Sequence, residues 1–185
     1  MVGGDLQMWL AKALREWHEF YILLGTAGAT LLALLFVALS VGVGYLRVQR
    51  AANIRTFMSP VVIHFAAVFF ISAIALVPGH RAEFFAVIIV LTGLVGIAVS
   101  GAVTIGVLKS KVRSVDVIDC FAYGFLPAAA YAALIVAAGM IIAEVETASL
   151  DILGGALLLL LIVNVRNAWD LTLAMVHKHA SHNAG

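Results

Sequence analysis

The side chains best suited to chemistry in this sequence are a few ionisable, amide and phenol groups that interrupt long apolar stretches. They are His64, Asp119, Tyr123, Asn164, Arg166, Asn167 and Asp170. A histidine beside a carboxylate titrates near neutral pH, and such a pair is suited to proton exchange. One interpretation is therefore that His64 and Asp170 form a relay for a proton, an ion or a small polar solute.

A second interpretation is that these polar groups hold helices together. At about 100° per residue, Asn164, Arg166, Asn167 and Asp170 cover one continuous arc of a helix. Arg166 and Asp170 are then an i,i+4 ion pair, and the two asparagines bond to neighbouring helices, at roughly 0.6–2 kcal/mol per bond. The sequence leaves both interpretations open.

Cofactor chemistry and catalysis have weaker support in the residue spacing. A b-type haem needs two axial ligands at similar depth on facing helices, for which His64 and His177 are the candidates. His177, His179 and His182 carry metal-binding side chains but lack supporting carboxylates or thiols, so we predict no metal site. No phosphate-binding loop is present, and Ser100 lacks the flanking residues of an intramembrane serine protease. We therefore predict that the protein is not an enzyme.

The composition indicates that these polar residues lie in a lipid bilayer. Of the 185 residues, 64% are apolar and only 11% are charged, and the mean hydropathy is +1.11. Soluble domains have about 45–50% apolar and about 25% charged residues. One soluble core of this size cannot hide that surplus. The net charge of +1 and the single cysteine also exclude a nucleic-acid binder and a disulfide scaffold.

Five apolar stretches approach or exceed the roughly 20 residues that a helix needs to cross a bilayer. Because an unpaired backbone amide is costly in lipid, these stretches predict helices. The fold prediction is an all-α bundle of five transmembrane helices. Ser59 and Pro60 are interpreted as the start of the second helix, and Pro127 as a kink in the fourth. The predicted spans are about 20–45, 60–77, 84–108, 117–143 and 150–176, and whether the last is one continuous helix is left open.

The flanking segments complete the predicted topology. Residues 5–20 are interpreted as an amphipathic helix lying at the membrane interface, with its tryptophans at headgroup depth. Residues 177–185 are interpreted as a flexible tail. Lys and Arg accumulate on the cytoplasmic side of membrane proteins, and eight of the 11 fall on the side that holds the C-terminus. The sequence therefore predicts an N-terminus outside and a C-terminus in the cytoplasm.

Small residues form a predicted packing surface on the third span. Gly93, Gly96, Ser100 and Thr104 are small, and the last three form a ridge at four-residue spacing. Such a ridge lets a neighbouring backbone approach closely. Packing within one chain is the first interpretation, and a homodimer face or a docking face for another membrane protein is the second.

Three segments resemble small bacterial inner-membrane proteins of unassigned function, in which an RNAWD-like helix ends the chain. The segments are residues 57–65 (FMSPVVIHF), 123–131 (YGFLPAAAY) and 165–170 (VRNAWD). The resemblance covers the predicted second to fifth spans and includes His64, Pro127, Asn167 and Asp170. It implies a bacterial cytoplasmic membrane and implies nothing about activity.

The expected function follows from the small size, the lack of a predicted extramembrane domain and the scarcity of polar groups. We expect a non-enzymatic accessory, assembly or scaffold subunit. Its expected partners are the bilayer and another membrane protein or a second copy of itself, with no nucleic acid and no cofactor. A small transporter or channel component with a His64–Asp170 relay is the alternative, and a haem-binding redox subunit is the third candidate.

Overall fold

The described part of the chain is almost entirely helical. The computed structural model describes residues 2–43, 48–79, 81–109 and 124–180, and these ranges contain no strand. The all-α prediction is therefore confirmed for this part of the chain. The helices are α1 (Val2–Glu16), α2 (His18–Val43), α3 (Val48–Ala75), α4 (Ala82–Lys109), α6 (Leu126–Ile142) and α7 (Glu146–Ala180).

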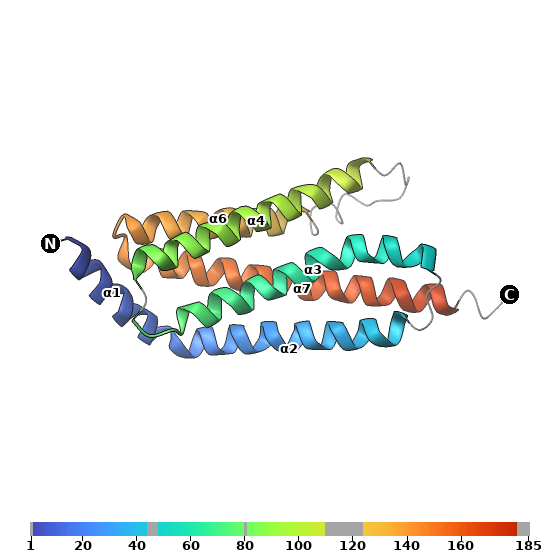
Figure 1. The fold of residues 1–185 in the computed structure, drawn as a ribbon, viewed down its shortest axis with the longest axis horizontal. Helices are drawn as coiled ribbons and strands as arrows, with labels where there is room; N and C mark the ends of the chain where they lie inside the picture. Colours follow the sequence, from blue (N-terminus) through green and yellow to red (C-terminus); the bar gives the residue numbers. More distant parts are fainter. Residues whose placement is uncertain (1, 44–47, 80, 110–123, 181–185) are drawn as a thin grey trace.

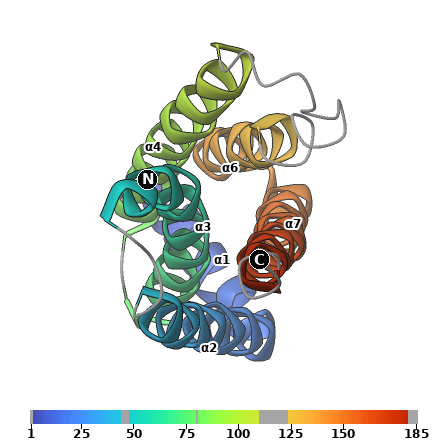
Figure 2. The ribbon, with the colours of Figure 1, turned by 90° about the vertical axis from the view of Figure 1, so that its right-hand side faces the viewer.

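The five long helices run up and down along one common direction (Figure 1). The turns that follow α3 and α6 lie at the same end as α1, whereas α7 ends at the opposite end. Viewed along the bundle, the helices surround a common interior (Figure 2). The most extensive packing joins α2 to α3, α4 to α6 and α6 to α7, and α3 also packs on α4 and α7.

Three of the described helices are long and apolar enough to cross a membrane. Their apolar segments are His18–Ala38 in α2, Ala82–Gly106 in α4 and Ala148–Asp170 in α7. By this measure the structure has fewer membrane-spanning candidates than the five predicted. The other two predicted spans contain shorter apolar helical segments, Pro60–Ala75 and Leu126–Ile142.

The helix ends differ from the prediction at several points. α3 begins at Val48, so Pro60 lies inside a helix and does not open one. Pro127 lies in the first turn of α6, where its missing N–H is harmless, and it therefore kinks no described helix. The fifth predicted span is one helix, α7, which continues to Ala180 and so includes the first residues of the predicted tail.

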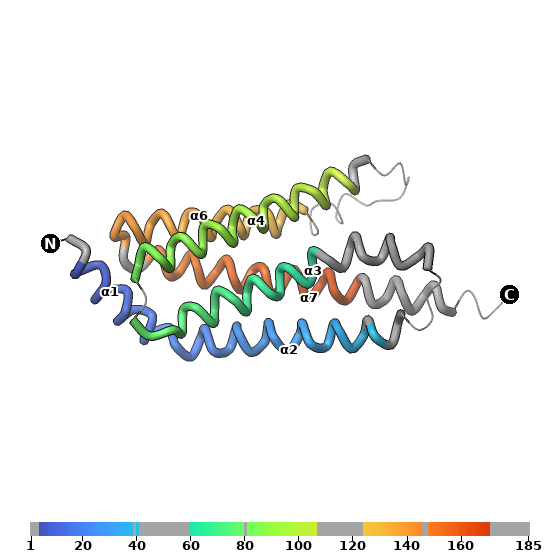
Figure 3. Tube along the Cα trace, viewed as in Figure 1, coloured from blue at the N-terminus to red at the C-terminus, as the bar shows by residue number. Residues whose placement is uncertain are grey.

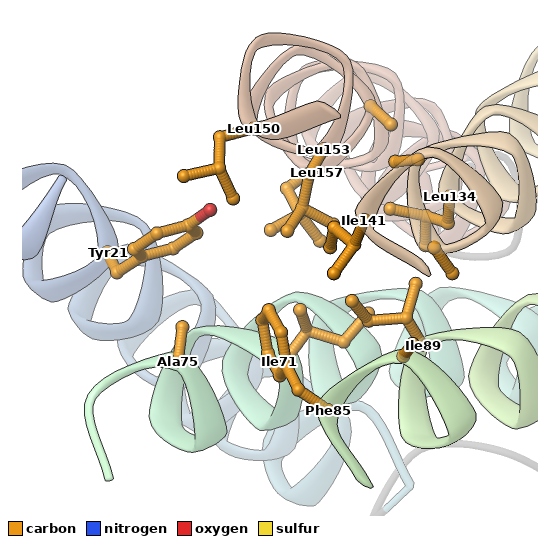
Figure 4. Close-up of a cluster of buried hydrophobic side chains, with 14 of the residues drawn as sticks. Tyr21, Ile71, Ala75, Phe85, Ile89, Leu134, Ile141, Leu150, Leu153 and Leu157 are labelled. Atoms are coloured by element: carbon orange, nitrogen blue, oxygen red, sulfur yellow. The ribbon is translucent and has the colours of Figure 1, made fainter. Parts of the chain in front are cut away.

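A large apolar core fills the half of the bundle nearer to α1. Side chains from α2, α3, α4, α6 and α7 point into the common interior there (Figure 4). Tyr21, Ile71, Phe85, Leu134 and Leu153 are all fully buried. Most of the buried side chains in this half are apolar, and the hydroxyls of Tyr21 and Ser72 are buried among them.

Helix α1 covers the end of the bundle, as the chain path in Figure 3 shows. Leu6, Leu10 and Leu14 recur every four residues and are buried, while Lys12 and Arg15 are exposed. The helix is therefore amphipathic, as predicted. Its leucine face packs against the bundle, and the helix contacts α2, α4 and α7. The apolar face therefore contacts protein and not lipid, which differs from the predicted helix at the membrane interface.

Candidate functional site

A hydrogen bond between two buried side chains is at the centre of the candidate site. Nδ1 of His64 on α3 lies 2.8 Å from the hydroxyl of Tyr131 on α6. The imidazole tautomer decides which atom donates. His64 is only 2% exposed and Tyr131 is fully buried. The bond therefore joins two helices in a water-poor interior, where an unpaired imidazole or phenol would be costly.

The glycines of α4 make room for the Tyr131 ring. A Cβ atom on Gly96 would overlap this ring, and one on Gly93 would lie 2.6 Å from Cγ1 of Ile135. Farther along α4, the hydroxyl of Thr104 donates to the carbonyl of Ser100 at 2.9 Å. The predicted ridge therefore faces α6 of the same chain, which is the first of the two interpretations.

Asn164 ties α7 to α3 close to this hydrogen bond. Its Nδ2 donates to the backbone carbonyl of Val61 at 2.7 Å, and Val61 lies about one turn before His64. Asn164 and Ser100 are each 1% exposed, yet Oδ1 of Asn164 and Oγ of Ser100 have no hydrogen-bond partner in the described structure. We refer to His64, Ser100, Tyr131 and Asn164 as the polar layer.

The ion pair of α7 lies outside this layer. Nε of Arg166 is 3.9 Å from Oδ2 of Asp170, and the two side chains are 51% and 39% exposed. Asn167, in contrast, is buried like Asn164. The predicted polar arc is thus divided, because a helix buries only the part of its surface that faces its neighbours.

The predicted partnership of His64 with Asp170 is therefore not observed. Tyr131 occupies Nδ1 of His64, and Asp170 pairs with Arg166 on the outer surface. Only Nε2 of His64 would remain for an axial haem ligand.

Several predicted site residues cannot be placed. Asp119, Tyr123 and His182 lie outside the described residues, and for His177 and His179 only the helical backbone is described. Among the described residues, no three His, Cys, Asp or Glu side chains come together in a way that could hold a metal ion.

Sequence reasoning missed Tyr131 as a site residue. It stands four residues after Pro127 in an apolar run, and it was included only in a segment of the resemblance. A tyrosine at this depth is itself a signal, because a buried phenol usually finds a hydrogen-bond partner. Knowing that the partner is His64 requires the packing of α3 against α6.

Comparison with known proteins identifies no relative of this chain. No family model matches the chain, and no curated protein or solved structure does so either. The resemblance to bacterial inner-membrane proteins therefore remains a prediction from the sequence.

Proposed function

We propose that the chain is a non-enzymatic accessory, assembly or scaffold subunit of a bacterial cytoplasmic membrane. In this proposal all five long helices cross the bilayer, with the N-terminus outside and the C-terminus in the cytoplasm. The protein then acts through contacts with another membrane protein or with a second copy of itself, and it carries out no chemistry.

The observation that carries this proposal is that side chains of the polar layer form hydrogen bonds between helices. His64 bonds to Tyr131, and Asn164 bonds to the carbonyl of Val61, so the donors connect one helix to another. Most of the other buried side chains are apolar. A bundle whose buried imidazole, phenol and amide bond to neighbouring helices, in a mostly apolar interior, is better suited to presenting a surface than to moving a solute.

Helix lengths support five crossings. α3 has 28 residues, or about 42 Å at 1.5 Å per residue, more than the roughly 30 Å of a hydrocarbon core. The described part of α6 has 17 residues, or about 26 Å, and the predicted span extends it toward residue 117. The alternating helix directions in Figure 1 are those that five crossings require.

The test is purification of the tagged chain from its own membranes in a mild detergent, with quantitative mass spectrometry of whatever co-elutes. A second membrane protein in stoichiometric amount, missing from a control purification of an unrelated tagged membrane protein, is the expected result. A chain that elutes alone and monomeric would contradict the proposal.

A second function, transport of protons or small polar solutes, has one observation in its favour. The polar layer contains two buried oxygen atoms without partners, on Ser100 and Asn164, beside a histidine that can exchange protons. In reconstituted vesicles, Tyr131→Phe should then abolish flux while Tyr21→Phe leaves it unchanged. Equal flux in both variants would remove this candidate.

A further inference from the structure

A groove lies at the α1 end of the bundle, between α1 and the end of α3. Its volume is about 420 Å³, within the range of roughly 300–1,000 Å³ that is usual for ligand sites. Leu10, Leu14 and Ala75 line it and are themselves buried, so one part of the groove is an apolar wall. The turn at Pro78 and Gly79 lines it on the side of α3.

The groove also has a cationic side, which Arg15 forms. His18 lines it as well, and the lining includes no carboxylate. Nε of Arg15 donates to the carbonyl of Ala11, another lining residue, at 3.2 Å. This bond uses only Nε of the Arg15 guanidinium group, so the two Nη groups can donate to other acceptors. The ion pairs found among the described residues, Arg81–Glu83 and Arg166–Asp170, do not involve Arg15.

In a bundle that spans a membrane, the groove would lie near the level at which lipid headgroups meet hydrocarbon. The apolar segments of α2 and α4 begin at this end of the bundle, at His18 and Ala82. An arginine at such a boundary extends its charge toward the headgroups while its stem covers apolar surface. Guanidinium groups bind phosphate through paired charge-assisted hydrogen bonds.

We propose that this groove binds one glycerophospholipid, with its phosphate at Arg15 and His18 and the upper part of an acyl chain against Leu10, Leu14 and Ala75. The cationic side and the apolar wall together match the two chemically different parts of such a lipid. This inference depends on the membrane location of the bundle, and it does not depend on the accessory role proposed above.

The experiment compares two lipids that share the same chains. The purified full-length protein in detergent is titrated with dioleoylphosphatidylglycerol or with dioleoylglycerol, which lacks the phosphate, and binding is followed by the rise in Tm. We expect the phospholipid to raise Tm at a concentration about tenfold or more below that needed for dioleoylglycerol, as the loss of a charge-assisted bond implies. Equal effects of the two lipids would overturn the phosphate contact.

Three variants locate the site. Arg15→Gln should weaken phospholipid binding about tenfold or more, whereas Lys12→Gln, on the exposed side of the same helix and outside the lining, should leave it unchanged. Ala11→Trp should fill the groove and prevent binding of both lipids, and Ala11→Leu provides a smaller obstruction if the tryptophan impairs folding. Equal losses in the arginine and lysine variants, or full binding with the groove filled, would overturn the proposal.

Discussion

At the residue scale, the two tyrosines that the structure describes have different surroundings. The hydroxyl of Tyr131 is hydrogen-bonded to His64. The hydroxyl of Tyr21, which points into the core beside Leu150 in Figure 4, has no hydrogen-bond partner in the described structure. Both rings are fully buried. The same substitution at the two positions therefore separates the contribution of the hydrogen bond from that of the ring.

We expect Tyr131→Phe to lower the free energy of unfolding by about 1–3 kcal/mol, because it leaves the buried imidazole of His64 without this partner. Tyr21→Phe should change it little or raise it, since the hydroxyl removed has no partner to lose. Unfolding in detergent, followed by helical circular dichroism, measures both. Equal effects in the two variants would mean that the bond between α3 and α6 contributes nothing.

The division of the α7 arc gives a second prediction at this scale. Asn164→Leu removes a buried bond between helices and should lower the free energy of unfolding by about 0.6–2 kcal/mol. Asp170→Asn breaks a half-exposed ion pair and should cost about 0–1 kcal/mol. The same unfolding measurement ranks the two variants, and a larger effect at Asp170 would contradict the view that the buried bond contributes more than the ion pair.

The sequence located the polar residues but could not pair them. His64, Asn164 and Asn167 were predicted site residues, and all three are buried. Helical periodicity places Asp170 on the same arc as the asparagines, but it does not show how wide a strip the neighbouring helices cover. That width depends on α3 and α6, which are distant in sequence, so the partnership of His64 with Tyr131 could not be predicted.

At the element scale, glycines decide how closely helices approach. Gly28 of α2 lies against the backbone of α3, where a Cβ would come within 3.3 Å of Phe65 O and Phe69 N. Gly154 of α7 receives the ring of Trp17, since a Cβ there would lie 2.7 Å from Cζ3. The ridge on α4 was predictable from its spacing. Gly154 was not, because only the fold brings Trp17, which lies between α1 and α2, against α7.

The contrast between two glycines of α4 tests this packing. A Cβ on Gly96 would overlap Tyr131, whereas one on Gly101 would meet nothing within 4 Å. We expect Gly96→Ala to lower the free energy of unfolding by about 1–3 kcal/mol through overpacking. Gly101→Ala should be neutral or stabilising by up to about 1 kcal/mol, because alanine favours helix. A tolerated Gly96→Ala would show that α4 and α6 are farther apart than the structure has them.

At the scale of the whole molecule, the apolar core and the polar layer meet at Tyr131. Its ring belongs to the large apolar cluster, and its hydroxyl is hydrogen-bonded to His64. The composition and the apolar stretches predicted a helical membrane protein and the order of its helices. They did not predict that α1 packs on the bundle, because an amphipathic helix has the same pattern whether its apolar face meets lipid or protein.

The orientation of the whole molecule gives the last prediction. In a Cys120→Ser background, Glu144→Cys places one thiol at an exposed site in the turn after α6, and Ala184→Cys places one near the C-terminus. An impermeant maleimide added to intact cells should label position 144 and should reach position 184 only after the cells are broken open, since basic residues are retained on the cytoplasmic side. The reverse labelling pattern would show that the protein has the orientation opposite to the predicted one. Labelling of both positions in intact cells would show that an even number of membrane crossings separates residues 144 and 184.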